Sequence, residues 1–284
     1  MAETAGKPGQ QRPWGRYVPI AEHGLIGDLR TVALVGTDGT IDWYCCPAFD
    51  SPSVFAALLD AERGGAFELA AAAPATTRQF YFPDTNVLIT RFFTEDGVGE
   101  VQDFMPVTGR AAGGDETDRH RLIRRVLCVR GTVPFRVRVA PRFNYGADPH
   151  TLRAVDGMGE LALFQSAESS LALTATVPLE CDGPDVRAEF KLAEGEAAVF
   201  ALDQVGGDVV PRGCARTEAE DAFQTTVSYW RHWLSASRYR GRWREMVHRS
   251  ALTLKLLTYA PTGAIVAAAT TSLPEQLGGE RNWD

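Results

Sequence analysis

Two aspartates, Asp42 and Asp50, lie on either side of an aromatic and proline-containing segment, residues 43–49. A pair of carboxylates facing one cavity could serve a hydrolase as acid and base. The same pattern is typical of a strand end, a tight loop and a helix cap, and 36 acidic residues make chance pairs common. A third interpretation is a rigid loop whose residues Trp43, Phe49 and Asp50 face a sugar or a neighbouring domain. These three are therefore candidate domain-interface residues, and no residue of the chain is assigned a catalytic role.

Other patterns with known chemistry are missing from the sequence. The histidines lack metal-ligand spacing, and neither a G-x-S-x-G elbow nor a phosphate-binding glycine loop occurs. The cysteines fit neither a zinc site nor a C-x-x-C redox motif. We therefore expect no metal, no cofactor and five reduced thiols. The residues concerned are His23, His120, His150, His232 and His248, and Cys45, Cys46, Cys128, Cys181 and Cys214.

Charge and hydropathy exclude several classes of partner. The net charge of −7 and the pI near 5.4 argue against a surface for nucleic acid or anionic membranes. Apolar runs are shorter than the ~20 residues that a membrane span needs, and the first residues are polar and lack a signal-peptide core. We expect a cytoplasmic protein with a disordered tail at residues 1–14; an oligomer remains possible.

The elements that would position these residues are mostly strands. Hydrophobic alternation with a period of two runs from about residue 24 to 204, which indicates antiparallel sheets packed as a sandwich. Residues 36–39 predict a hairpin turn, and Gly131-Thr132 predicts a second hairpin, between strands at 121–130 and 133–142. The basic run at 119–130 is interpreted as a strand with a solvated face. Ser51 and Pro52 predict the start of a short helix.

The period changes to that of a helix at Thr217, where Thr217-Glu-Ala-Glu220 has the form of a capping box. An apolar stripe from Ala219 to Leu234 follows. A second amphipathic helix begins near Trp243 and ends before Pro261. A single amphipathic helix cannot bury its own apolar face, so we expect the second helix to dock on the sandwich or on further sequence.

Several segments, in this order, resemble the front of bacterial glycoside hydrolases of family 15, the glucoamylase and trehalase-like group. The resemblance covers nearly the whole chain from about Arg16. Its segments are Pro19–Asp28, Gly39–Trp43, Pro47–Phe55, Arg249–Ala268, Thr271–Glu275 and Arg281–Asp284.

This resemblance implies a mainly β fold: an antiparallel β-sandwich (a supersandwich), a linker helix and the first helix of an incomplete (α/α)6 barrel. The implied division is a tail at 1–14, the sandwich at 15–210, a helical linker at 211–240 and the start of a helical catalytic domain at 241–284. It follows that the chain is expected to be truncated.

The resemblance also implies an inverting hydrolysis of α-glucosidic bonds by two glutamates that lie later in the family's sequence. The substrate would be trehalose, maltose or a longer α-glucan. Arg281, Trp283 and Asp284 match the rim of the substrate pocket, and Thr271 and Ser272 match the loop before it. The segment is thus expected to be structural and inactive by itself. The alternative is a stand-alone carbohydrate-binding or scaffolding sandwich that has lost its barrel.

Overall fold

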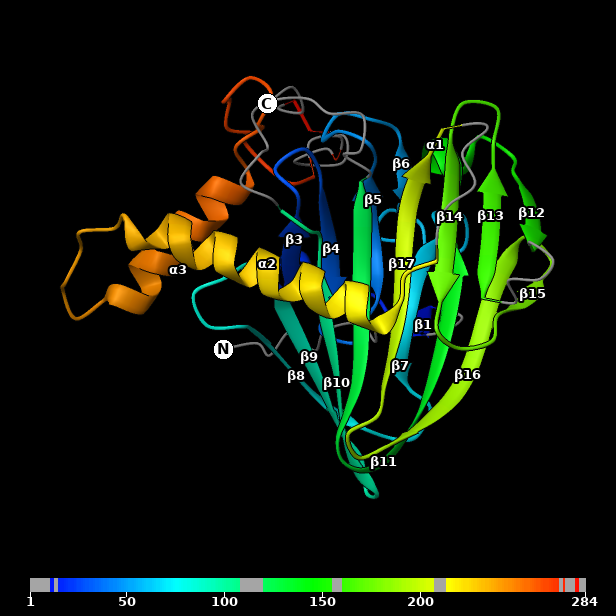
Figure 1. Ribbon diagram of the computed structural model, residues 1–284. Coiled ribbons are helices and arrows are strands. Elements are labelled where there is room, and N and C mark those ends of the chain that lie inside the picture. Colours follow the sequence, from blue (N-terminus) through cyan, green and yellow to red (C-terminus); the bar gives the residue numbers. More distant parts are fainter. Residues whose placement is uncertain are drawn as a thin grey trace, which may run out of the picture.

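The structure is a computed structural model that describes residues 11–12, 15–107, 120–154, 160–206, 213–270, 273 and 279–280. Two β-sheets lie face to face, and two longer helices follow them in sequence and pack on one side (Figure 1). The prediction of an antiparallel β-sandwich followed by helices is confirmed.

Each sheet is antiparallel throughout its described strands. Sheet 1 has the order β3-β4-β5-β7-β11-β16-β15, with β6 paired to β5, and sheet 2 has the order β8-β9-β10-β11-β17-β14-β13-β12. Sheet 1 consists of β3 (His23–Gly27), β4 (Val32–Gly36), β5 (Ile41–Cys45), β6 (Ser53–Phe55), β7 (Ala66–Ala71), β15 (Glu180–Asp182) and β16 (Asp185–Ala193). Sheet 2 consists of β8 (Thr76–Tyr81), β9 (Leu88–Phe93), β10 (Gly97–Phe104), β12 (Thr151–Ala154), β13 (Leu161–Gln165), β14 (Ser170–Ala175) and β17 (Ala197–Val205). Outside the sheets are the ribbon β1 (Gln11–Arg12) with β2 (Gly15–Arg16), the 3-10 turn η1 (Ile20–Glu22) and the short α1 (Phe143–Gly146).

A single strand, β11 (Arg121–Ala140), belongs to both sheets. Its first half pairs with β10 and β17, and its second half pairs with β7 and β16. The predicted hairpin across Gly131-Thr132 is therefore wrong. Gly131 has a φ of +68° and leaves no room for a side chain, since a Cβ there would lie 2.2 Å from the Asp96 carbonyl oxygen. The glycine bends one strand from sheet 2 into sheet 1 instead of reversing the chain.

The hairpin predicted at residues 36–39 is confirmed. β4 and β5 pair antiparallel, and the amide of Gly39 donates to the Gly36 carbonyl at 2.9 Å. Gly39 has a φ of +86°, a conformation that L side chains rarely adopt. The turn lies against β7, since a Cβ on Gly39 would be 2.3 Å from the Leu69 carbonyl oxygen.

An ion pair is fully buried in the space between the sheets. Arg124 and Asp103 both have fully buried side chains, and they are joined by two hydrogen bonds, Nε to Oδ1 at 2.8 Å and NH2 to Oδ2 at 3.1 Å. Arg124 comes from sheet 2 but also donates across the core to the carbonyls of Phe67 (2.8 Å) and Gly39 (2.5 Å) in sheet 1. The solvated face predicted for this basic run is wrong at Arg124, because here the guanidinium supplies donors to carbonyls that would otherwise be buried without partners.

Helix α2 (Arg216–Ser235) covers the outer face of sheet 2 (Figure 1). Its apolar stripe, including Phe223 and Val227, packs on residues of β9, β10, β11 and β17. The predicted capping box is wrong: the cap position is Ala215, which makes no side-chain cap bond. The carboxylates of Glu218 and Glu220 pair instead with Arg121 and Arg125 of β11, so they attach the helix to the sheet.

The predicted helix after Ser51 is also wrong. The segment forms strand β6, in which Phe55 pairs with Tyr44 of β5 and is fully buried. The Ser51 hydroxyl accepts a hydrogen bond at 3.0 Å from the amide of Ala48, three residues earlier in the chain, so it closes a loop and does not cap a helix. Burial of Val54 and Phe55 in the sandwich core outweighs the local helix signal.

Candidate functional site

The segment after the last helix packs on one end of the sandwich, which we call the junction: residues 257–270 and 273 together with β5 and the loop that follows it. Trp43 of β5 is 1% exposed and lies in an apolar cluster with Leu34, Cys45 and Ala56. Its indole Nε1 donates to the Ala269 carbonyl at 3.2 Å. A buried indole thus links the sandwich to sequence more than two hundred residues away.

Phe49 makes the second junction contact. Its ring meets the Tyr259 ring edge-on at a centroid distance of 6.2 Å, and it is 5% exposed. Next to it, the amide of Ala260 donates to the Leu29 carbonyl at 2.8 Å. Asp50 is exposed. Since Trp43 and Phe49 are both buried against the chain's own C-terminal segment, neither offers an aromatic face to a sugar.

Helix α3 (Arg244–Leu256) is held on the sandwich by the loop between β8 and β9. Arg249 donates to the Thr85 carbonyl at 2.8 Å, and its guanidinium lies 3.9 Å from the centre of the Tyr81 ring. Asn86 donates from its side chain to the Leu252 carbonyl at 3.0 Å. Burial lowers the pKa of Arg249, and the neighbouring Tyr81 acts in the opposite direction. These contacts fix the middle of α3 on the loop between β8 and β9.

The two aspartates singled out by the sequence differ in environment. Asp42 is fully buried and accepts from His23 Nε2 at 3.1 Å. The other ring nitrogen of His23 donates to the Pro19 carbonyl at 2.9 Å. Both nitrogens face acceptors, and an imidazole that carries two protons donates to both at once. Burial alone would lower the pKa of His23, but the bonds and charge of its acceptors together raise it. Asp42 is thus part of a buried ion pair. A substrate in contact with the exposed Asp50 could not reach it, so the two aspartates do not form a catalytic pair.

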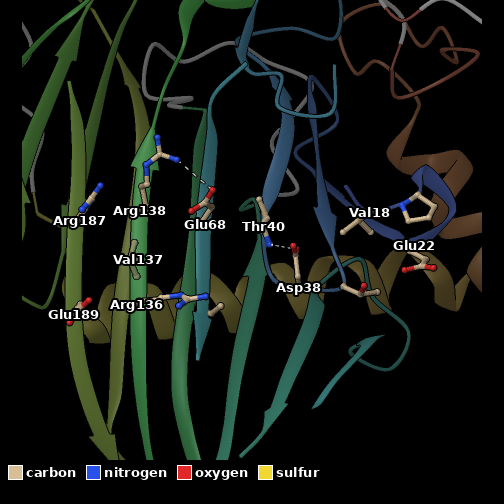
Figure 2. A pocket seen from close by; sticks show the side chains of 13 residues that line it. Val18, Glu22, Asp38, Thr40, Glu68, Arg136, Val137, Arg138, Arg187 and Glu189 are labelled. Atoms are coloured by element: carbon tan, nitrogen blue, oxygen red, sulfur yellow. Dashed lines mark hydrogen bonds and ion pairs between the residues drawn. The ribbon is translucent and has the colours of Figure 1, made fainter. Parts of the chain in front are cut away.

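A hollow of about 360 Å³ opens on the outer face of sheet 1, between the β4–β5 turn, β7, β11 and β16; we call it the outer hollow (Figure 2). Its polar lining has three arginines and four carboxylates, with two threonines at the turn. The charged members are Glu22, Asp38, Glu68, Arg136, Arg138, Arg187 and Glu189. The sequence predicts strands in this region, but it does not show which of them lie side by side.

Strand register explains the hollow. Arg136 of β11 lies opposite Ala70 of β7 on one side and Glu189 of β16 on the other. Two residues further along β11, Arg138 lies opposite Glu68 and Arg187. The methyl group of Ala70 leaves a depression in a surface otherwise covered by long side chains. Figure 2 shows Arg136 reaching across β7 at this point.

Comparison with known proteins identifies the fold. Residues 12–199 match the family described as "Trehalase-like, N-terminal". The chain belongs to this family. The matched part of this trehalase-like chain runs from β1 into β17 and so contains both sheets and the outer hollow.

Relatives of the trehalase-like chain extend the similarity beyond the family match. Proteins named "Trehalase" from Mycolicibacterium smegmatis and Thermoplasma volcanium are each 35% identical to it, and one from Mycobacterium tuberculosis is 34% identical. Each alignment covers 94% of this chain and 42% of the relative. The trehalase-like chain therefore spans about two-fifths of the length of these relatives.

The remaining predicted site residues belong to the last part of the sequence. Arg281, Trp283 and Asp284, expected at the pocket rim, lie outside the described residues, as do Thr271 and Ser272. Within the part that the structure describes, no cluster of three or more histidine, cysteine or acidic side chains could hold a metal ion. None of the helices in that part is long and apolar enough to cross a membrane.

Proposed function

We propose that this chain is the N-terminal, structural part of an inverting α-glucoside hydrolase of glycoside hydrolase family 15 that acts on trehalose in the cytoplasm. The family match and the relatives named trehalases support the hydrolase class and the substrate. In this proposal the chemistry belongs to a helical catalytic part, and the chain alone is inactive. Maltose and longer α-glucans are the competing substrates.

The junction is the observation that supports a structural role most directly. Three separate contacts attach the helical segment to the sandwich: the indole bond of Trp43, the ring contact of Phe49 and the arginine bonds of Arg249. Trp43 and Phe49 bury their rings there, and such burial stabilises by a few kcal/mol per side chain. We propose that these contacts, with Asp50 at their edge, fix the helical catalytic part on the sandwich, so that residues 15–210 form the support, 211–240 the linker and 241–284 the start of the catalytic part.

The outward face of α3 fits the same role. Met246 is 65% exposed and Leu254 is 55% exposed, although both follow the helix's apolar spacing. In helical domains such residues are covered by neighbouring helices. We propose that further helices of the catalytic part cover them and that the pocket rim includes Arg281, Trp283 and Asp284.

The reaction itself needs two carboxyl groups about 6.5–9.5 Å apart, one protonating the leaving oxygen and one activating water. We assign neither role to a residue of this chain, since Asp42 is buried in an ion pair with His23.

Two measurements test the proposal. The purified 284-residue chain should release no glucose from trehalose above the buffer rate, and glucose release at an enzymatic rate would refute the proposal. The product of the native gene should have a mass well above 30.9 kDa and should hydrolyse trehalose. A native product of 30.9 kDa that binds α-glucosides without hydrolysing them favours the stand-alone binding sandwich instead.

Hydrogen exchange provides a structural check on the same chain. If further helices normally cover α3, its amides should exchange much faster in the isolated chain than those of α2, which is buried along sheet 2. Equal protection of the two helices would contradict the proposed role of α3.

A further inference from the structure

We propose that the outer hollow binds a neutral carbohydrate, and specifically an α-glucoside. The proposal combines three observations: a cavity of suitable size, polar groups not engaged by the protein, and a charge balance that disfavours ionic ligands. The carbohydrate class comes from these observations, whereas the choice of an α-glucoside rests on the proposed function.

Two neighbouring rows of side chains on one side of the hollow differ in their bonding: one row is held by ion pairs and the other is not. Arg138 is held by Asp185 at 2.7 Å and by Glu68 at 3.6 Å, and this row keeps its geometry without a ligand. In the neighbouring row, Arg136 and Glu189 are cross-strand partners, yet neither side chain makes a hydrogen bond or ion pair with any residue in the described part of the chain. A donor fork and an acceptor therefore flank the depression over Ala70 with their bonding capacity unused.

The opposite wall combines a polar turn with apolar surface. Asp38 is held by a bond from the Thr40 amide to its Oδ1 at 2.9 Å, which fixes the carboxylate at the rim (Figure 2). Val18 and Pro19 complete this side of the hollow and present carbon atoms. At about 360 Å³ the hollow is within the range of about 300–1,000 Å³ found for small-molecule sites.

Charge selects the class of ligand. An anion would meet four carboxylates in the lining, and a cation would meet three arginines. An arginine can only donate hydrogen bonds and a carboxylate can only accept them, whereas a hydroxyl group does both. A neutral molecule with several hydroxyl groups can satisfy both kinds of side chain at once, and its C–H surface can lie on Ala70, Val18 and Pro19. A sugar has these properties, so the lining of the outer hollow favours a carbohydrate.

Titration of the isotopically labelled 284-residue chain with trehalose and with maltose tests the site by NMR. At least one of the two sugars should give saturable shifts of the amides of Ala70, Arg136 and Glu189. Sodium sulfate at the same concentrations should not. Absence of saturable shifts with both sugars, or sulfate binding at the same amides as tightly as the sugar, would overturn the proposal.

Matched variants separate the site from general effects. Arg136→Ala should weaken sugar binding about tenfold or more, because it removes a charged donor. Ala70→Leu keeps every polar group but fills the depression, so it should abolish the shifts. Arg130→Ala is the control, since Arg130 is an exposed arginine of the same strand that does not line the hollow. Equal binding by the Arg136 variant and the control would refute the assignment.

Failure here is distinguishable from failure of the proposed function. The binding measurement uses the chain alone and needs no hydrolysis, whereas the proposed function is tested by glucose release from the native product. A native product that hydrolyses trehalose while the chain binds no sugar refutes only the outer hollow as a site. The reverse result refutes only the proposed function.

Discussion

The buried pair of Arg124 and Asp103 predicts that Arg124→Met is strongly destabilising. The arginine connects sheet 2 to sheet 1 through two carboxylate bonds and two carbonyl bonds, with both side chains fully buried. Methionine fills similar space but supplies no donor. The variant therefore leaves a carboxylate and two carbonyl groups in an apolar core without their partner.

The size of the effect follows from these lost contacts. Removing one partner of a buried ion pair typically costs about 3–5 kcal/mol. Each carbonyl that loses its donor adds about 1 kcal/mol. For a chain of this size, a loss of even 3 kcal/mol lowers Tm by about 5 °C or more. In the double variant Arg124→Met/Asp103→Leu no unpaired carboxylate remains. Most of the stability lost by breaking the ion pair should therefore be recovered, while the loss from the two carbonyl groups without donors persists.

The pH dependence of the single variant is a further signature. Burial already raises the pKa of Asp103, with Arg124 acting against it, so loss of Arg124 raises that pKa further. A group whose pKa is raised in the folded state stabilises the protein at low pH and ceases to do so as the pH rises through its folded value. The loss of stability in the single variant should therefore be larger at pH 8 than at pH 5.

Thermal and urea unfolding followed by circular dichroism would measure these differences. The control is Arg130→Met, because Arg130 is exposed on the same strand. If Arg124→Met is as stable as the control, or the double variant is no more stable than the single one, the role given to this pair is refuted.

Three other predictions concern the junction, the buried histidine and the thiols. Trp43→Phe replaces the indole with a smaller ring and removes the donor to Ala269. It should cost more than the ~1 kcal/mol of the lost bond, because the smaller ring leaves a cavity, and it should speed hydrogen exchange in residues 257–270; unchanged exchange there would contradict the junction contact. Because bonds to its acceptors raise the pKa of His23 above its ordinary 6.5, the pair stabilises the fold fully below that pH and loses this effect as the pH rises through the folded value. His23→Gln should accordingly cost most stability at acidic pH in unfolding experiments, unlike the exposed control His232→Gln, and a cost independent of pH would count against the charged pair. Iodoacetamide at pH 8 should modify only Cys181 in the folded chain and all five cysteines after denaturation, because the other four are buried and burial raises the pKa of Cys45 and of Cys46 to about 12. Rapid labelling of a second cysteine, detected by mass spectrometry, would be inconsistent with this.

Local periodicity was sufficient to predict the sandwich and the helices α2 and α3. Phe135, Val137 and Val139 face the core as the alternation indicates, and the stripe that includes Phe223 and Val227 is buried under α2 as its spacing indicates. In these segments the periodic burial of apolar side chains agrees with the tertiary structure, and consistent signals of this kind are the most reliable.

Long-range pairing decided the elements that the sequence could not predict. A glycine between two alternating segments is compatible with a turn or a bend, and only the partners of β11 make Gly131 a bend. Arg124 has the same spacing as an exposed residue of a strand, and its burial depends on Asp103 and on carbonyls from the opposite sheet. The outer hollow likewise exists because registers place Ala70 beside Arg136, which no local pattern encodes.

The path of β11 makes the two sheets a single mechanical unit. The half of β11 that holds β10 and β17 continues without a break into the half that holds β7 and β16, so a disturbance of one sheet passes along this strand into the other. A chain break in the middle of this strand, at Gly131, would divide the molecule into two halves that each lack an edge partner. A break at Gly183, in the exposed turn between β15 and β16 where nothing lies within 4 Å of an added Cβ, would cut the backbone and leave that connection intact. Circular permutants and split versions of this fold should therefore open at Gly183 and keep β11 whole.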